Sequence, residues 1–339
     1  MKTITLTAPG NLVANSAESL HPPGEGEALV RVHRIGVCGT DIHAFGGRQP
    51  FFTYPRILGH ELGVEVVSVG PAVQNVKAGD RCSVEPYINC GSCVACVAGK
   101  PNCCTAIRVL GVHSDGGMRE QLILPARKLH RSDHLTFGQL ALVETLAIGC
   151  HAVERAQLKS GEFALVIGAG PIGLSVMQFA VEKGAQVIVL DLNEARLTFC
   201  QQQLGVHHLI NANEGKTVET LLALTDGQLP TAVFDVTGNP RSMAAAFDFP
   251  AHGGRLVFVG LFQGDVSFHD PNFHRRELSL LASRNALPAD FTRIIHLLEG
   301  GRIDTKPWIT HRATFDDVVM KFPEWTKPET GVIKAMIEM

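Results

Sequence analysis

Two patterns of apolar residues divide the chain. From residue 28 to about residue 130, short runs of alternating apolar and polar residues are separated by Gly, Pro and Asp turns, as in ALVRVHRIGV, GVEVVSV and EQLILPA. Alternation with a period of two is typical of half-buried β-strands. The first part of the chain is therefore predicted to be a β-rich domain.

From about residue 160 the pattern changes to apolar strands that each lead into a helix or loop. FALVIGAG precedes PIGLSVMQFAVEKG, QVIVLDL precedes NEARLTFCQQQLG, TAVFDVTG precedes NPRSMAAAFDF, and GRLVFVG precedes a loop. Strands and helices in repetition predict a parallel, doubly wound sheet. The later helical pattern FTRIIHLLEG and the terminal strand GVIKAMIEM are expected to return to the first domain, which makes that domain discontinuous.

Length and charge narrow the class of protein. A chain of 339 residues is about twice the length of a typical domain, which favours two domains. Its 30 basic and 33 acidic residues give a formal charge of −3 without a block of like charge, so neither a nucleic-acid nor a membrane partner is expected. The first residues lack a signal-peptide core, and we expect a cytoplasmic protein that acts on small molecules.

The stretch from residue 163 to residue 181 is apolar and about long enough to span a bilayer. Three glycines and a proline interrupt it, which fits a strand, a turn and a helix better than a membrane span. The chain also has nine cysteines, and in a reducing cytoplasm a cluster of cysteines indicates a metal site rather than disulfides.

Four cysteines have the spacing of a metal site. In CGSCVACVAGKPNCC, two residues separate Cys90 from Cys93 and Cys93 from Cys96, and seven separate Cys96 from Cys104. Such spacing lets a glycine-containing turn wrap four thiolates around a structural zinc ion. Iron–sulfur ligation is the alternative, but the fourth cysteine lacks a following proline and there is no second cluster. Cys103 competes with its neighbour, and the register favours Cys104.

A glycine motif follows the strand FALVI. Gly168, Gly170 and Gly173 form G-x-G-x-x-G, which suits a tight turn, the approach of a pyrophosphate to the backbone, and close packing of helix on strand. The next strand ends in Asp191, 18 residues after the third glycine. A carboxylate there accepts hydrogen bonds from ribose hydroxyls and repels a 2′-phosphate, which favours NAD over NADP. Arg196 is either a phosphate ligand or, as we favour, a solvated charge on the next helix.

In combination these motifs resemble one family. The order GVCGTDIH, GHE, a four-cysteine lobe, GAGPIG and DVTG is similar to the zinc-dependent medium-chain alcohol dehydrogenases, in particular their polyol, sugar-acid and threonine dehydrogenase branch. The resemblance implies an α/β chain with a GroES-like catalytic domain, residues 1–147 and 286–339 with a zinc lobe at 86–106, and a Rossmann domain at 148–285. It also implies NAD contacts at Pro171, Ile172, Thr237 and Gly238 besides the glycines, Asp191 and Arg196.

The resemblance further implies a second, catalytic zinc in the cleft between the domains. Cys38 and His60 match two of its ligands, and Glu144 matches the third, although this chain has Glu-Thr-Leu where the family usually has Glu-Pro-Leu. Glu61 resembles a glutamate that exchanges with water or substrate at the metal. Whether Glu61 or Glu144 is the resident ligand is open.

Residues near Cys38 match the proton path of the family. Thr40 matches a hydroxyl that contacts the reacting oxygen, and His43 is a candidate outer member of the path. Asp41 is either a partner that orients a metal ligand or a helix-start carboxylate.

The substrate is predicted only by class. The segments GGRQPFFTYPRILGHE, GVHSDGG and SRNALPADF resemble bacterial enzymes that oxidise hexonates, and Arg48, Arg56 or Arg108 is a candidate partner for a sugar-acid carboxylate. The leading hypothesis is NAD-dependent oxidation of a secondary hydroxyl on a sugar acid or polyol, with two zinc ions per chain.

L-Threonine 3-dehydrogenase is the alternative within the class. A catalytically idle NAD(H) sensor is the alternative from another class. The resemblance also implies a homodimer or homotetramer.

Overall fold

The structure, a computed structural model, describes residues 1–50 and 52–339. Phe51, within the segment from residue 46 to 61 noted above, lies outside the described residues. The chain forms two compact units, one of Met1–Thr145 with Leu287–Met339 and one of Leu146–Ala286. These limits differ from the domain limits expected from the sequence by one or two residues.

The first unit is built on an open sheet with strand order β10-β6-β5-β3-β18-β17, and β9 pairs with one end of β3. A smaller sheet, β2-β1-β4, and the pair β7-β8 complete its strands among the described residues. The strands are β1 (Lys2–Ala8), β2 (Asn11–Ser16), β3 (Glu27–Val37), β4 (Arg56–Ile57), β5 (Glu61–Val69), β6 (Arg81–Val84), β7 (Tyr87–Ile88), β8 (Arg108–Val109), β9 (Gln121–Pro125), β10 (Leu129–Arg131), β17 (Ile309–Thr314) and β18 (Lys334–Glu338).

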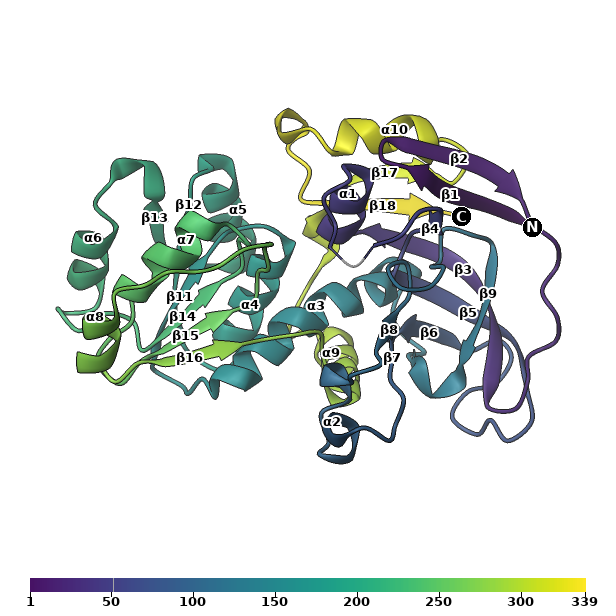
Figure 1. Cartoon of the computed structure of the whole chain (residues 1–339), viewed down its shortest axis with the longest axis horizontal. Helices are drawn as coiled ribbons and strands as arrows, with labels where there is room; N and C mark the ends of the chain where they lie inside the picture. Colours follow the sequence, from purple (N-terminus) through teal and green to yellow (C-terminus); the bar gives the residue numbers. More distant parts are fainter. Residues whose placement is uncertain (51) are drawn as a thin grey trace. The chain divides into compact units, whose positions relative to one another are not determined.

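The alternating pattern of the sequence determines which face of this sheet is buried. On β3, Ala28, Val30 and Val32 are buried, and the side chains between them are half-buried or exposed. A register shift between Val32 and Arg34 keeps apolar side chains facing the core beyond that point. The C-terminal strand β18 pairs antiparallel with β3, so the end of the chain returns to the first unit, as the pattern predicted (Figure 1). Strand β17 was not predicted.

The second unit has a parallel sheet with strand order β13-β12-β11-β14-β15-β16. This order confirms the predicted doubly wound sheet. The strands are β11 (Phe163–Ile167), β12 (Gln186–Asp191), β13 (His208–Asn211), β14 (Ala232–Asp235), β15 (Arg255–Phe258) and β16 (Ser279–Ala282). Only four of them were predicted. Strands β13 and β16, which were not, are the two edges of the sheet, where most side chains are half-buried or exposed and the pattern of a buried strand is weaker.

Helices lie beside the sheets within each unit (Figure 1). They are α1 (Gly39–Phe45), α2 (Val94–Val97), α3 (Phe137–Ala156), α4 (Pro171–Glu182), α5 (Glu194–Leu204), α6 (Thr217–Leu224), α7 (Pro240–Ala245), α8 (Asp270–Arg275), α9 (Pro288–Glu299) and α10 (Val318–Trp325). Helix α3 runs through Glu144, Thr145 and Leu146 without a break. Threonine has the backbone N–H that proline lacks, so the departure from Glu-Pro-Leu is compatible with a continuous helix.

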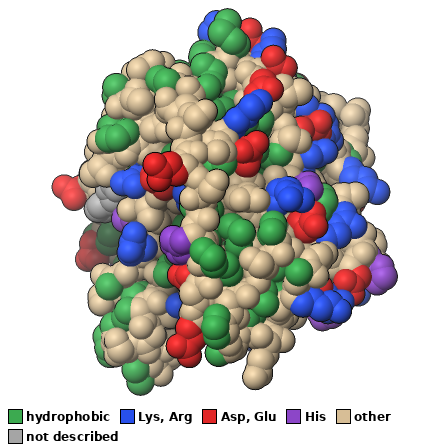
Figure 2. Space-filling model, turned by 90° about the vertical axis from the view of Figure 1, so that its right-hand side faces the viewer, with side chains coloured by type: hydrophobic (Ala, Val, Ile, Leu, Met, Phe, Trp, Pro, Cys, Tyr) green, Lys and Arg blue, Asp and Glu red, His purple; other side chains and the backbone are tan. Residues whose placement is uncertain are grey.

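In the described part of the chain, no helix has both the length and the apolar character needed to cross a membrane. The apolar stretch that begins at residue 163 forms β11 and most of α4, as expected from its glycines. On the face drawn in Figure 2, basic and acidic side chains lie interspersed.

Candidate metal and nucleotide sites

The four cysteines of the lobe come together. The sulfur atoms of Cys90, Cys93, Cys96 and Cys104 all lie within 4.8 Å of one another. Backbone N–H groups of Cys96 and Thr105 lower the pKa of Cys93 to about 5. Since zinc binds the thiolate, this environment favours a metal-binding form. The exposed Cys103 is outside the group, as the register predicted.

A second group combines a thiol, an imidazole and a carboxylate. Ligand atoms of Cys38, His60 and Glu61 lie within 4.8 Å of one another. Cys38 stands between β3 and α1, whereas His60 and Glu61 stand at the start of β5. The adjacent strands β3 and β5 therefore bring together residues that are far apart in the sequence. This donor set suits zinc.

Asp41 supports this group from behind. Its carboxylate accepts a hydrogen bond from the Cys38 N–H at 2.9 Å, and its Oδ1 lies 3.7 Å from Nδ1 of His60. Nδ1 of His60 thus faces Asp41, and Nε2, the other ring nitrogen, is available on the side of Cys38. Burial alone lowers the pKa of His60, but the charges of Asp41 and Cys38 outweigh it and raise that pKa well above its usual value. A carboxylate behind a ligating imidazole is the usual arrangement at metal sites.

Glu61 is held by a residue that the sequence analysis missed. Nζ of Lys334 on β18 donates to both carboxylate oxygens of Glu61, at 2.6 and 2.9 Å, and both side chains are buried. Burial lowers the pKa of Lys334, but the charge of Glu61 opposes it and the pKa is raised overall. The sequence signal was a lysine inside the apolar strand VIKAMI, but its partner lies 273 residues away.

Glu144 lies near this group but not in it. It is buried on α3, and its Oε1 accepts a hydrogen bond from the hydroxyl of Tyr87. Burial raises the pKa of Glu144, whereas the charge of the nearby His60 lowers it. Among the described residues, the structure thus groups Glu61 with Cys38 and His60, and it gives Glu144 a separate partner that the sequence analysis also missed.

The other residues expected near the metal follow Cys38 on α1. Thr40 is half-buried in the first turn of this helix. His43 is one turn further, and its pKa is lowered by partial burial and by the charge of Arg48.

Of the arginines considered for a substrate carboxylate, Arg56 is already paired with Asp115 at 3.3 Å.

The glycine motif forms the turn between β11 and α4. Gly168 has a φ of +104°, which favours glycine, and a Cβ on Gly173 would lie 1.9 Å from the carbonyl oxygen of Gly168. Gly170 is the N-cap of α4, with Pro171 and Ile172 as the first helical residues. Glycine is therefore required at 168 by the positive φ and at 173 by the close approach of the backbone, and the start of the helix is left as an anion-binding position.

Asp191 and Arg196 lie beside this turn. Asp191, at the end of β12, accepts hydrogen bonds from the N–H groups of Ala169 at 2.6 Å and Asn193 at 2.7 Å. Arg196 is on α5, as expected, but it is not simply a solvated charge. Its guanidinium would lie 3.8 Å from a Cβ on Gly170, beside the glycine turn.

Thr237 and Gly238 follow β14 in the same sheet. The Thr237 hydroxyl donates to Asp235 at 2.7 Å, and Gly238 has a φ of +59°. A Cβ on Gly238 would lie 2.7 Å from the carbonyl oxygen of Leu261, so this turn also packs tightly against backbone.

Comparison with known proteins identifies the family. A model of the alcohol dehydrogenase GroES-like domain matches residues 24–135, and a model of the zinc-binding dehydrogenase domain matches residues 171–300. The chain is 42% identical over 337 residues to L-galactonate-5-dehydrogenase of Escherichia coli strain K12, which covers 99% of this chain and 98% of the relative. The chain belongs to the zinc-type alcohol dehydrogenase family. It is an oxidoreductase with a GroES-like domain and a Rossmann-like domain, as the resemblance implied.

Solved structures of this family show the same fold. An alcohol dehydrogenase, rspB, of E. coli CFT073 complexed with NADH is 30% identical with a TM-score of 0.93, covering all of this chain and 99% of the other. A zinc-binding dehydrogenase of Sinorhizobium meliloti 1021 bound to NADP is 28% identical with a TM-score of 0.90, with the same coverage. These relatives support a nicotinamide cofactor for the family and differ in which one they carry.

Proposed function

We propose that this dehydrogenase oxidises a secondary hydroxyl on a sugar acid or polyol and transfers the hydride to C4 of NAD⁺. The observation that carries the proposal is the group of the half-buried Cys38 with the buried His60 and Glu61, which has the donors of a zinc site, in a chain 42% identical to a sugar-acid dehydrogenase. A bound zinc ion with an open position would stabilise the alkoxide form of the substrate.

The residues around this group have distinct proposed roles. Cys38 and His60 hold the metal, and Asp41 orients the imidazole of His60. The half-buried Thr40 hydroxyl would relay the alcohol proton by accepting it while giving up its own, and the exposed His43, three residues on in α1, would pass a proton to solvent.

For the third protein ligand, both glutamates stay candidates. Lys334 engages both oxygens of Glu61 and so restrains its approach to a metal, whereas one oxygen of Glu144 is engaged by Tyr87. We propose that Glu144 is the resident ligand and Glu61 the exchanging carboxylate.

NAD is proposed as the cofactor because of Asp191. The charge of this carboxylate opposes a 2′-phosphate, and two backbone N–H groups hold it beside the glycine turn. Arg196 is proposed to contact the cofactor from the other side of the same turn, next to Gly170.

A substrate screen tests the proposal. Hexonates, neutral polyols and L-threonine are offered with NAD⁺, and NADH formation is followed. Hexonates or polyols are expected to be oxidised. Preference for L-threonine would support the alternative 3-dehydrogenase. NADH binding without turnover of any class would support the idle sensor.

Metal analysis tests the proposed two zinc ions per chain. The purified protein is expected to contain about two zinc per chain, and Cys104→Ser is expected to lose one because a thiolate of the lobe is removed. The matched variant Cys103→Ser changes an exposed neighbour outside the group and should keep both. One zinc in the unmodified protein, or equal loss in the two variants, would contradict the assignment.

A further inference from the structure

The segment Glu85–Asn89 links the cysteine lobe to Glu144, the proposed third ligand of the catalytic metal. It contains β7 and leads directly into Cys90, the first cysteine of the lobe. Alternate side chains of this segment, those of Glu85, Tyr87 and Asn89, each make a polar contact with another part of the first unit. Only Tyr87 and Ile88 of the segment are in a strand, so these three side-chain contacts hold the loop residues on either side of β7 as well as β7 itself.

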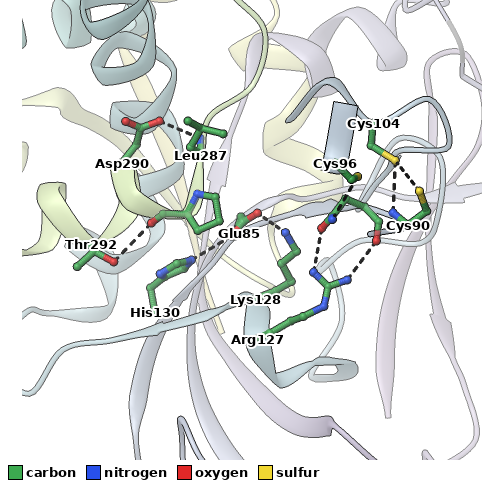
Figure 3. A network of polar contacts seen from close by, with 12 residues as sticks. Glu85, Cys90, Cys96, Cys104, Arg127, Lys128, His130, Leu287, Asp290 and Thr292 are labelled. Carbon is green, nitrogen blue, oxygen red and sulfur yellow. Dashed lines mark hydrogen bonds and ion pairs between the residues drawn. The ribbon is translucent and has the colours of Figure 1, made fainter. Parts of the chain in front are cut away.

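The first end of the segment is held by buried charge. Glu85 accepts hydrogen bonds from Lys128 and from His130 at 3.2 Å, and Glu85 and Lys128 are almost fully buried (Figure 3). A paired and hydrogen-bonded buried carboxylate resists displacement, because losing one partner leaves an uncompensated charge.

The other end is held at the cysteine lobe. Asn89 accepts two hydrogen bonds from Arg127, at 2.8 Å on its side chain and 3.1 Å on its carbonyl, and its amide donates to the sulfur of Cys96 at 3.6 Å. Figure 3 shows Arg127 reaching toward the lobe beside Cys90 and Cys96. Hydrogen bonds and an ion pair thus fix the position of the segment at both of its ends.

Tyr87 stands between these two ends. Its side chain is only 3% exposed, its ring packs edge-on against Phe291 with centroids 6.4 Å apart, and its hydroxyl donates to Oε1 of Glu144. Phe291 is also stacked on His130, a partner of Glu85, at 4.8 Å. The phenol therefore has little freedom, and it presents its proton to one oxygen of a buried carboxylate.

We propose that Tyr87 is a positioning residue that fixes the carboxylate of Glu144 for the catalytic metal. This inference rests on the proposed role of Glu144. Hydrogen bonding of Oε1 to Tyr87 restricts the rotation of the carboxylate, and Oε2 would then be the oxygen that Glu144 offers to a bound metal. The anchored segment, and with it the lobe, supports this geometry from outside the reacting group.

The physical effect is one of preorganisation. A buried glutamate without a donor would sample several side-chain rotamers, and ordering it on metal binding would cost free energy. With the hydroxyl of Tyr87 in place, the Glu144 side chain is already ordered in the folded protein, so metal binding does not have to order it. Partners of this kind change metal affinity by roughly 10- to 100-fold.

The test is Tyr87→Phe, which removes the hydroxyl and keeps the ring against Phe291. The readout is the rate at which a chelator removes the catalytic zinc, together with the visible spectrum of the protein with cobalt in that site. We expect release to become about 10-fold faster or more and the cobalt spectrum to change, while release of the lobe zinc stays the same. Unchanged release and spectrum would overturn the proposal.

Two controls sharpen this test. Tyr54 is the other tyrosine of the chain, and its hydroxyl donates to the carbonyl of Ala44. Tyr54→Phe therefore removes an equivalent hydroxyl that does not contact Glu144, and it should leave metal release unchanged. In Glu144→Ala no carboxylate remains for Tyr87 to position, so adding Tyr87→Phe should cause no further acceleration. Additive effects of the two substitutions would overturn the inference.

These outcomes are distinguishable from failure of the proposed function. An unmodified protein with a second zinc but no activity on any offered alcohol refutes the substrate assignment, whereas metal release still reports on Tyr87. A protein that binds only the lobe zinc refutes both.

Discussion

Three buried carboxylates, those of Asp41, Glu61 and Glu144, lie around His60, and each has a different partner. Asp41 accepts backbone N–H groups, Glu61 is paired with Lys334, and Glu144 accepts the hydroxyl of Tyr87. Buried charges are costly unless they are paired. Lys334 is a buried cation, and the charges of Glu61, Cys38 and Glu144 all raise its pKa, so these groups depend on one another for compensation.

At the same scale, Cys38→Ser tests the metal group directly. A serine hydroxyl is a poor zinc ligand, so turnover should fall by about 1,000-fold or more while NADH binding persists, because the nucleotide turn lies in the other unit. Steady-state kinetics and a fluorescence titration with NADH measure the two effects. Cys103→Ser is the matched control and should retain full activity. Full activity in Cys38→Ser would refute its catalytic role.

Asp191→Asn tests the choice of cofactor. Asparagine keeps an acceptor for the N–H groups of Ala169 and Asn193 but loses the charge that repels a 2′-phosphate. We expect the preference for NAD⁺ over NADP⁺, measured as the ratio of kcat/KM values, to fall by about 10-fold, which corresponds to roughly 1.4 kcal/mol. An unchanged ratio would mean that ribose recognition lies elsewhere.

At the scale of secondary structure, the turn between β11 and α4 and the strand β18 show two ways in which elements build sites. The turn is local, because Gly168 and Gly173 meet within one strand-to-helix connection. In contrast, β18 carries Lys334 into the first unit through pairing with β3, at the far end of the chain. A site within one local turn can be predicted from the spacing of its residues in the sequence. A site formed by strand pairing can be predicted only when the strand order of the sheet is known.

Gly173→Ala tests the close approach within the turn. A Cβ there would lie 1.9 Å from the carbonyl oxygen of Gly168, so backbone must shift, at a cost of about 2 kcal/mol or more. We expect a lower melting temperature and weaker NADH binding.

Gly138→Ala on α3 is the matched control for that substitution. Its new methyl group would meet its nearest atom at 3.7 Å, an ordinary contact, and alanine favours a helix over glycine by up to about 1 kcal/mol. Its melting temperature should be equal to or above that of the unmodified protein. Equal effects of the two substitutions would show that the turn is not tight.

At the scale of the whole molecule, the end of the parallel sheet in the second unit is exposed. Strand β16 pairs with β15 on one side and is the last strand of the sheet among the described residues, and Leu280 on it is 42% exposed. Unpaired edges with apolar side chains favour association with another sheet edge. We therefore propose that this edge takes part in forming a homodimer or homotetramer.

Leu280→Lys tests this assembly. A charge on the edge should oppose pairing and shift the protein to a smaller species in size-exclusion chromatography with light scattering. Met320→Lys, at an apolar residue that is 77% exposed on α10 of the first unit, is the control and should not alter the assembly. A monomeric unmodified protein, or an unchanged assembly in Leu280→Lys, would contradict the proposal.

The sequence by itself determined the features that depend on neighbours along the chain. The spacing of Cys90, Cys93, Cys96 and Cys104 predicted their cluster, and the glycine motif predicted the strand-to-helix turn, because each is closed within about 15 residues. Motif order also indicated that Cys38 and His60 act together, and the structure does bring them together.

Only the tertiary structure decided how the buried carboxylates are paired. Lys334 and Tyr87 have no sequence motif that assigns them to Glu61 and Glu144, since these partners are 273 and 57 residues apart. Their contacts arise from the pairing of β18 with β3 and from the packing of α3 and β7. Pairing of buried charge is a property of the folded interior, because low polarity there makes each group depend on the few atoms that packing places within reach.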